Sequence, residues 1–156
     1  MAKIPLVWRL MRFMNRRVAV NNSPNLKGGE LVLVLYHVGR KSGFPRATPL
    51  QYEEVDGDYY VASARGQQAD WFRNVVAHPQ VEMLVKGQRL PAQAEPVTDP
   101  AEIADFLEMR LIRHPRMMRA MLRMEGLHGR ITPEDLLRIS KGKALVILHP
   151  ISSENP

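Results

Sequence analysis

Residues 31–50 read LVLVLYHVGRKSGFPRATPL, and the architecture expected for the chain starts from this segment. Its first eight residues form a continuous apolar run, which is typical of a strand buried on both faces. Residues 47–54 are predicted to be the return strand, so the polar segment between them is a hairpin turn. Turns are usually built from Asn, Asp and Gly and need no cluster of cations. This turn nevertheless carries Arg40, Lys41 and Arg46, so we interpret it as a site for a phosphate or a carboxylate.

The turn has further features of an anion site. Ser42 and Thr48 would add hydroxyl donors, and the glycines at 39 and 43 allow a ligand to approach the backbone closely. A solvated basic hairpin is the alternative, because exposed Lys and Arg are common on protein surfaces. The residues alone leave both interpretations open.

The composition is that of one globular domain. The chain has 156 residues, of which 45% are hydrophobic and 24% are charged, and this length suffices for a real core. It has no cysteine, which excludes disulfides, thiolate metal sites and a cysteine nucleophile. The net charge of +6 favours an anionic partner, such as a nucleic acid, an anionic membrane or an acidic small molecule. No apolar run reaches the roughly 18 residues of a spanning helix, and arginines interrupt the N-terminus, so a cytoplasmic location is expected.

Turn signals divide the rest of the chain into short strands and helices. Asp56-Gly57 and Lys86-Gly87-Gln88 are hairpin signals, whereas Thr98-Asp99-Pro100 and Thr132-Pro133 are helix starts. The predicted strands cover 59–63, 81–85, 90–97 and 143–149, and the predicted helices cover 3–20, 70–76, 100–114, 116–124 and 133–141. Because the strands mostly follow one another through hairpins, we expect an α+β fold, a mainly antiparallel β-barrel with attached helices. Residues 1–150 would form one domain, followed by a tail at 151–156.

The N-terminal segment, residues 1–20, is predicted to be an amphipathic helix. Its apolar residues fall at helical spacing. Its charged residues are all cations: Lys3, Arg9, Arg12, Arg16 and Arg17. Such a helix either packs on its own domain or lies in a membrane interface, where residues 1–18 would contact anionic lipid.

Several common site chemistries find no support in the sequence. The turn lacks the GxxxxGK[ST] spacing of a P-loop, no GxGxxG follows a strand, and no GxSxG elbow is present. The five histidines, at 37, 78, 114, 128 and 149, do not have metal-ligand spacing, so no metal site is expected. No helix-turn-helix or RNP-type strand is apparent, so nucleic acid is not an expected partner.

Two other clusters are candidates for a site. Residues 62–66 end a strand in small side chains, and Trp71 and Asn74 follow on one helical face, so a flat ring could lie against the backbone here. The alternative for these residues is core packing and capping. Residues 109–124 mix methionines with arginines, which suits an adaptable apolar pocket, a membrane contact, or an ordinary amphipathic helix with a methionine-filled core face.

Four blocks of the sequence together resemble the deazaflavin-dependent nitroreductase family, a branch of the split β-barrel flavin and deazaflavin oxidoreductases. Gly39 to Leu50 resembles the family's signature string, and Val61 to Gly66 resembles its Ala-Ser-Lys-Gly segment. Trp71 to Val75 is similar to its Trp-Tyr-x-Asn-Leu, and His78 to Val81 is similar to its Asn-Pro-x-Val. The order and spacing of the blocks also agree, and the last strand matches again. The resemblance implies an antiparallel split β-barrel with a helical lid, residues 99–141, inserted before that strand.

In that family the cofactor is coenzyme F-420, an 8-hydroxy-5-deazaflavin with a phospholactyl-oligoglutamate tail; FMN is the less favoured alternative. The resemblance implies twelve cofactor-binding residues. Those for the phosphate and the glutamates of the tail are Arg40, Lys41, Ser42 and Arg46. Those lining the channel to the ring are Thr48 and Pro49. Those bordering the ring are Ala62, Ser63, Ala64, Arg65, Trp71 and Asn74. Ser63 and Tyr52 are the predicted catalytic residues, which would orient the acceptor or the ring.

The expected activity is hydride transfer from reduced coenzyme F-420 to a quinone-like or other conjugated apolar acceptor. Family members often place tyrosines over the substrate in their C-terminal part, whereas all four tyrosines here precede residue 61. Residues 101–140 offer methionine, leucine and arginine instead, which suits a bulky apolar acceptor. The alternative is a carrier without turnover, because the same fold holds FMN, haem or fatty acids. Related barrels often pair, so a homodimer is also among the expected states.

Overall fold

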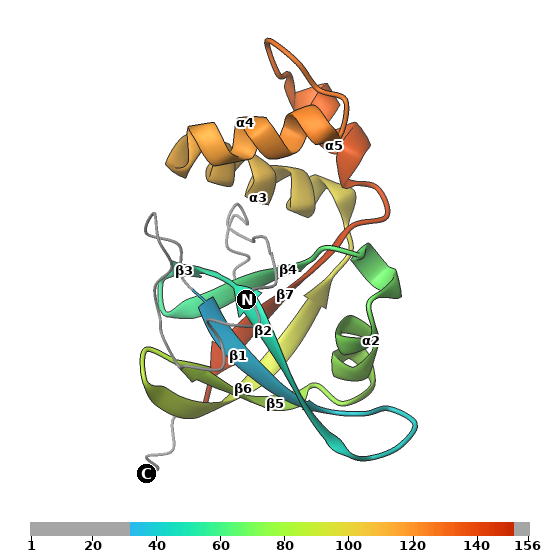
Figure 1. The fold of residues 1–156 in the computed structure, drawn as a ribbon, viewed down its shortest axis with the longest axis vertical. Helices are drawn as coiled ribbons and strands as arrows, with labels where there is room; N and C mark the ends of the chain where they lie inside the picture. The colour runs from blue at the N-terminus through green and yellow to red at the C-terminus, as the bar shows by residue number, and fades with distance from the viewer. Residues whose placement is uncertain (1–31, 152–156) are drawn as a thin grey trace.

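The computed structural model describes residues 32–151 as a single curled sheet with attached helices (Figure 1). The strands are β1 (Val32–Val38), β2 (Pro45–Gln51), β3 (Glu53–Val55), β4 (Asp58–Ser63), β5 (Gln80–Val85), β6 (Gln88–Val97) and β7 (Ala144–Pro150). The helices are the 3-10 turn η2 (Gly66–Gln68), α2 (Asp70–Ala77), α3 (Pro100–Arg113), α4 (Pro115–Met124) and α5 (Pro133–Ser140). The predicted N-terminal helix and most of the predicted tail lie outside the described residues.

The sheet is curled into a split barrel, and the chain itself joins its two edges. The strand order is β2-β1-β5-β6-β7-β4-β3, and every pairing is antiparallel. β2 at one edge and β3 at the other are consecutive in sequence, with only Tyr52 between them. The prediction of a single return strand over residues 47–54 is therefore wrong. One straight strand cannot pair with neighbours at both edges, so the backbone leaves β1 after Gln51 and joins β4 at Glu53.

The two larger hydrophobic clusters lie on the two faces of this sheet. The first fills the barrel, and the second lies between the barrel and the C-terminal helices. Strand β7 contributes to both, because successive side chains of a strand point to opposite faces. Val146 and Leu148 belong to the barrel core, whereas Leu145 and Ile147 pack under the helices. The apolar run of β7 thus reflects burial on both faces.

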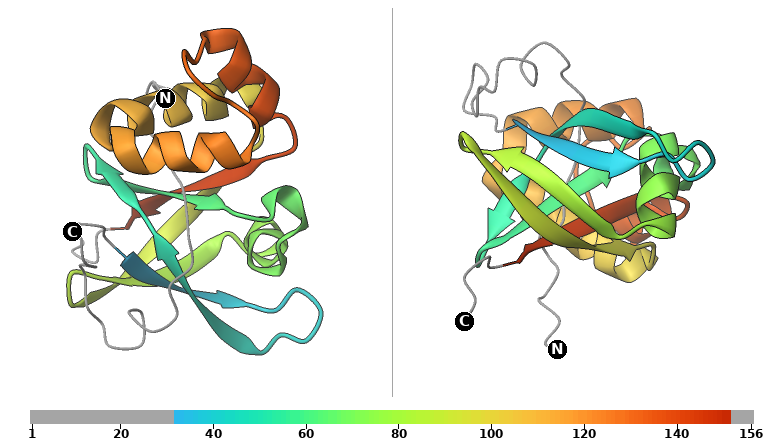
Figure 2. Two further views of the ribbon diagram at one scale, coloured as in Figure 1. Left: turned by 45° about the horizontal axis from the view of Figure 1, so that its top comes forward. Right: turned by 90° about the horizontal axis from the view of Figure 1, so that it is seen from below.

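Helices α3, α4 and α5 form the lid, a layer that covers one face of the barrel (Figures 1 and 2). Their boundaries follow the predicted signals. Asp99 caps α3 by accepting the N–H of Ala101 at 3.2 Å, and Thr132 and Asp135 form a reciprocal capping box at α5. Pro115 separates α3 from α4, because proline cannot continue the hydrogen bonding of a helix interior.

Helix α2 covers the barrel at a different place, beside the hairpin of β1 and β2 (Figure 1). Trp71, Phe72 and Val75 are buried in the barrel core, and this fixes the rotation of the helix. Asn74 on the same helix is buried as well, next to the turn that follows β1. Within residues 32–151, no helix has the length and apolar character needed to cross a membrane.

Candidate functional site

The turn between β1 and β2 is held in shape by its own backbone. The N–H of Gly39 donates to the carbonyl of Phe44, and the N–H of Gly43 donates to the carbonyl of Gly39, each at 2.9 Å. Ser42 Oγ accepts the N–H of Phe44 at 3.0 Å. A Cβ on Gly39 would lie 2.6 Å from Ser42 Oγ and 3.0 Å from Arg46 Nε. The absence of a side chain at Gly39 therefore lets Arg46 lie against the turn.

A cavity of about 530 Å³, the turn cavity, is bounded by β2, the end of β4, α2 and this turn. Its volume is in the usual range for small-molecule sites. Ten of the twelve predicted cofactor-binding residues line it: Arg40, Lys41, Ser42, Arg46, Thr48, Ala62, Ala64, Arg65, Trp71 and Asn74. The fold thus brings together three blocks that are separate in the sequence.

The cations of the turn cavity are not equivalent. Arg40 is tied to α2, because its guanidinium donates to Asn74 Oδ1 at 2.8 Å and pairs with the Asp70 carboxylate at 3.3 Å. By contrast, Lys41, Arg46 and Arg65 form no ion pair with any residue of 32–151. These three cations therefore supply the charge that a bound anion would meet.

A buried histidine, which the sequence did not mark as part of the site, also lines the turn cavity. His37 is 5% exposed, its Nε2 lies 2.9 Å from Thr48 Oγ1, and its Nδ1 lies 3.3 Å from Asn74 Nδ2. Burial and the nearby Arg46 guanidinium lower the pKa of His37 to about 4. The ring is therefore neutral at physiological pH. The sequence around His37 gives no local signal that this histidine contributes to a site. Within the described residues, no group of three metal-ligating side chains occurs.

The remaining predicted residues lie around the cavity rather than on it. Pro49 is on β2, half-buried and outside the lining. Ser63 is buried, and its hydroxyl donates to the carbonyl of Gly66 at 2.7 Å. Tyr52 lies in the barrel core against Tyr59, and burial raises the pKa of its phenol. The turn cavity therefore does not include either predicted catalytic residue in its lining.

A second cavity of about 410 Å³, the lid cavity, lies between the lid and the barrel. Its lining is mainly apolar and includes three methionines, Met118, Met121 and Met124, with the ion pair of Glu125 and Lys143 also in its wall. Ala62 and Ala64 line both cavities, so the end of β4 is the wall they share. The lid cavity offers little charge and adaptable packing to a ligand.

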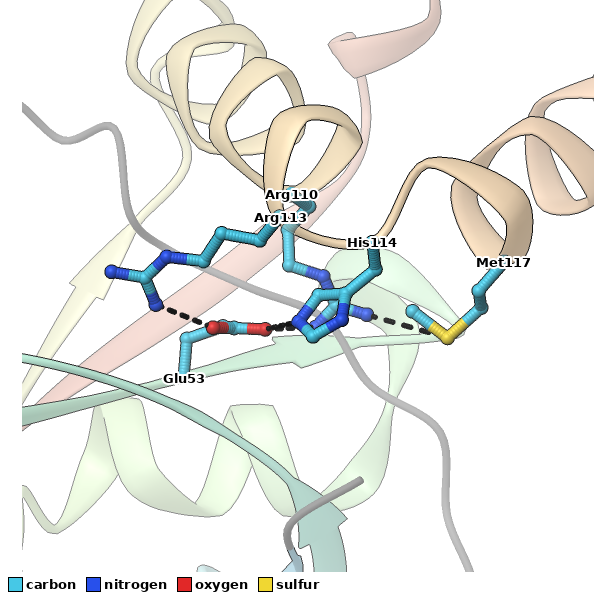
Figure 3. Close-up of polar contacts among 5 residues, drawn as sticks. All are labelled: Glu53, Arg110, Arg113, His114 and Met117. Atoms are coloured by element: carbon cyan, nitrogen blue, oxygen red, sulfur yellow. Dashed lines mark hydrogen bonds and ion pairs between the residues drawn. The ribbon is translucent and has the colours of Figure 1, made fainter. Parts of the chain in front are cut away.

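One carboxylate fastens the lid to the barrel (Figure 3). Glu53 on β3 accepts from Arg110 Nη1 at 3.0 Å, from Arg113 Nη1 at 2.7 Å and from His114 Nε2 at 2.9 Å. The three donors come from the end of α3 and the residue that joins it to α4. The side chains of Glu53 and Arg110 are buried, whereas those of Arg113 and His114 are more than a third exposed.

Comparison with solved structures identifies the fold as an antiparallel split β-barrel. An F420-H2 dependent reductase (FDR-A) superposes with a TM-score of 0.50 and 20% identity, covering 74% of this chain and 92% of that chain. A conserved hypothetical protein from Mycobacterium tuberculosis superposes with a TM-score of 0.57 and 15% identity, covering 93% and 86%. The heme storage protein HutZ from Vibrio cholerae gives 0.52 and 18%, covering 78% and 82%. At these identities the likeness concerns the fold alone.

Comparison with curated sequences and with a family model identifies the family. An F420H(2)-dependent quinone reductase from Mycobacterium tuberculosis is 38% identical over 76 residues, and so is a Mycobacterium bovis protein named "Putative F420H(2)-dependent quinone reductase". The aligned segment covers 46% of this chain, and the chain spans about half the length of these curated relatives, 50%. The sequence model of the family described as "F420H(2)-dependent quinone reductase" matches residues 7–121, which is most of the chain and includes the turn, the end of β4 and α2. The protein therefore belongs to the F420H(2)-dependent quinone reductase family.

Proposed function

We propose that the protein is an oxidoreductase that uses reduced coenzyme F-420 as hydride donor to a quinone-like or other conjugated apolar acceptor. The observation that carries this proposal is the turn cavity itself. It combines three cations that have no ion pair within residues 32–151, Lys41, Arg46 and Arg65, with a wall of small residues at the end of β4. A ligand with an anionic tail and a flat ring matches both parts of the cavity.

The tail and the ring of the proposed cofactor would bind at different ends of the turn cavity. Lys41 and Arg46 would bind the phosphate and the glutamates of the tail, with backbone N–H groups of the turn nearby. Ala62 and Ala64 would let the ring lie close to the backbone, and Trp71 would bound it on the α2 side. When bound, the cofactor supplies the hydride, and the protein has to place the acceptor and exclude water.

The lid cavity supports an apolar acceptor. It adjoins the turn cavity at Ala62 and Ala64, and its lining comes mainly from α3, α4 and the start of β7. An acceptor held there would reach the ring across small side chains, and the methionines would adapt to its shape. Residues 101–140 would thus act as a substrate lid rather than as a membrane contact. The orienting roles of Ser63 and Tyr52 stay predictions; for Tyr52 the effect would be indirect, since it lines neither cavity.

A binding titration tests the cofactor assignment. Coenzyme F-420 is added to micromolar protein and followed by its fluorescence or by calorimetry, and absence of binding would refute the proposal. Lys41→Ala and Arg46→Ala should weaken binding, and more for the long-tailed cofactor than for a tail-less deazaflavin. Arg138→Ala is the matched control, because Arg138 is an exposed cation on α5 that lines neither cavity. Equal losses for tailed and tail-less cofactor would remove the anion-site assignment.

A substitution in the lid tests the acceptor assignment separately. Met121→Trp would fill part of the lid cavity and should raise the KM for an apolar quinone while leaving cofactor binding unchanged. Ile112→Trp is the control, because Ile112 is 73% exposed on α3 and outside the cavity lining. An unchanged KM for Met121→Trp would place the acceptor elsewhere.

A second candidate function is a carrier without turnover, favoured by the apolar lid cavity. A flavin, haem or fatty acid is the ligand class to expect in that case. Mass spectrometry of ligand co-purified from the native host, with an absorbance spectrum as a first look, distinguishes a carrier from an enzyme.

Membrane association and pairing are further proposals. Residues 1–18, which lie outside the described residues, would bind anionic liposomes weakly from a cytoplasmic location, and deletion of 1–18 should abolish that binding. Binding that survives the deletion would move the contact to another surface. Sedimentation of the purified chain would distinguish the proposed homodimer from a monomer.

A further inference from the structure

A row of four polar side chains runs along the wall of the turn cavity. Arg40 Nη1 lies 2.8 Å from Asn74 Oδ1, Asn74 Nδ2 lies 3.3 Å from His37 Nδ1, and His37 Nε2 lies 2.9 Å from Thr48 Oγ1. All four residues line the cavity. They come from the turn, α2, β1 and β2, so the row connects the elements that enclose the site.

The donor and the acceptor of each hydrogen bond in the row follow from the contacts at its Arg40 end. Asn74 Oδ1 receives both the backbone N–H of Arg40, at 3.0 Å, and the Arg40 guanidinium. Two donors on the same atom identify it as the amide oxygen, so the Asn74 NH₂ group faces His37. The NH₂ group can only donate, and therefore His37 Nδ1 accepts. A neutral imidazole that accepts at Nδ1 carries its proton on Nε2, and that proton is donated to Thr48 Oγ1.

We infer that His37 is a positioning residue that directs the hydroxyl proton of Thr48 into the turn cavity. Because Thr48 Oγ1 already accepts from His37, its own proton is available to the ligand. The ligand atom that this proton reaches is then an acceptor, such as a phosphate, carboxylate or carbonyl oxygen. The inference rests on the proposed function for the identity of that ligand and on the geometry of the row for everything else.

The surroundings of His37 agree with a neutral ring. Arg46 is its cross-strand partner on β2, Arg40 lies at the far end of the row, and Asp70 on α2 pairs with Arg40. An imidazolium would add a positive charge beside Arg46 and would turn the Nδ1–H toward the Asn74 NH₂ group. Both effects oppose protonation, and burial opposes it further.

Nitrogen NMR of the ligand-free protein tests the row without any cofactor. With ¹⁵N-labelled histidine, the His37 ring at pH 7 should be neutral, with a proton on Nε2 and none on Nδ1. The His37→Gln variant provides the assignment of the resonance. A proton on Nδ1, alone or in an imidazolium, overturns the inference, because Nδ1 could not then accept from Asn74.

Substitutions test the consequence for binding, with coenzyme F-420 as the probe. His37→Leu should weaken binding about tenfold, the usual effect of losing one well-placed hydrogen bond to a charged group. His37→Gln keeps an N–H that can reach Thr48 and should restore most of the affinity. Thr48→Val should weaken binding to a similar extent, whereas Thr48→Ser keeps the hydroxyl and should not.

The decisive comparison is the double variant. In a Thr48→Val background, His37→Leu should cause no further loss, because the two residues act through one proton. A full additional loss would overturn the inference. If the wild-type protein does not bind coenzyme F-420, the proposed function fails, and the NMR experiment still decides whether the row exists. If His37→Leu does not fold, the contrast of Thr48→Val with Thr48→Ser and the NMR result decide together.

Discussion

Replacing Glu53 by glutamine should destabilise the protein by about 3 kcal/mol. Glu53 and Arg110 are buried, at 8% and 3% side-chain exposure, and removing one partner of a buried ion pair typically costs about 3–5 kcal/mol. We expect the lower end, because Arg113 and His114 are 40% and 38% exposed and water can replace their contacts. Glutamine keeps the size of the side chain but loses the charge, and its NH₂ group would face N–H donors.

The measurement is urea unfolding at pH 7, followed by circular dichroism. For a chain of this length about 3 kcal/mol corresponds to a fall in Tm of roughly 6–12 °C, so thermal unfolding gives a second check. Glu54→Gln is the matched control, because Glu54 is on the same strand, is 33% exposed and pairs with a half-exposed Lys86. Its cost should be at most about 1 kcal/mol, as for other exposed ion pairs.

A second variant separates lost charge from lost shape. Glu53→Gln combined with Arg110→Met removes both buried charges, and it should recover part of the stability that Glu53→Gln alone loses. A loss for Glu53→Gln as small as that for Glu54→Gln would refute the reasoning, because the Glu53 carboxylate would then behave as an exposed group despite its burial.

Three further predictions concern the turn cavity and its wall. Gly66→Ala should destabilise the protein by roughly 2 kcal/mol more than Gly129→Ala in urea unfolding. A Cβ at Gly66 would lie 2.4 Å from the Gly142 carbonyl oxygen, whereas a Cβ at Gly129 would meet nothing within 4 Å. The φ angles of +64° and +68° make the backbone strain of the two substitutions equal. His37→Gln should flatten the pH dependence of stability, because the pKa of His37 is about 4 in the folded protein and near 6.5 in the unfolded chain. Wild-type stability should fall by about 2–3 kcal/mol as the pH drops from 6.5 to 4. An equally steep fall in the His37→Gln variant would contradict this. Asp70→Asn should free the Arg40 guanidinium from its ion pair and tighten the binding of a long-tailed anionic ligand about twofold at low salt. Calorimetry can measure this effect, which should vanish at high salt.

Local signals were sufficient to predict most of the fold. Asp99, Thr132 and Pro115 mark the boundaries of the lid helices, and the Asp56-Gly57 turn lies where β3 and β4 join. Each of these signals depends on a few neighbouring residues, so a single sequence reveals it. The exchange of the strand between sheet edges at Tyr52 has no such signal, because it depends on which strands lie nearby in space.

The same distinction applies to the site. The cations of the turn and the small residues at the end of β4 were predictable, since turns with clustered cations are unusual and since the blocks occur in a recognisable order. His37 was not, because its role depends on Asn74, which is 37 residues away. Glu53 was not, because its partners lie 57 to 61 residues later in the chain. For Ser63 the sequence predicts a hydroxyl near the ring, and the structure adds that this hydroxyl donates to the Gly66 carbonyl.

The place of β7 in the sheet has a consequence for how the protein is made. β7 is the last strand of the described chain to be synthesised, yet it lies between β6 and β4, and Ser63 pairs with Ala144. Until the ribosome has produced the whole lid, β4 and β6 each lack a neighbour and expose an unpaired edge. Contacts so distant in sequence form slowly, and unpaired edges favour association between chains. Translation that stops within the lid should therefore yield aggregates rather than a smaller folded barrel.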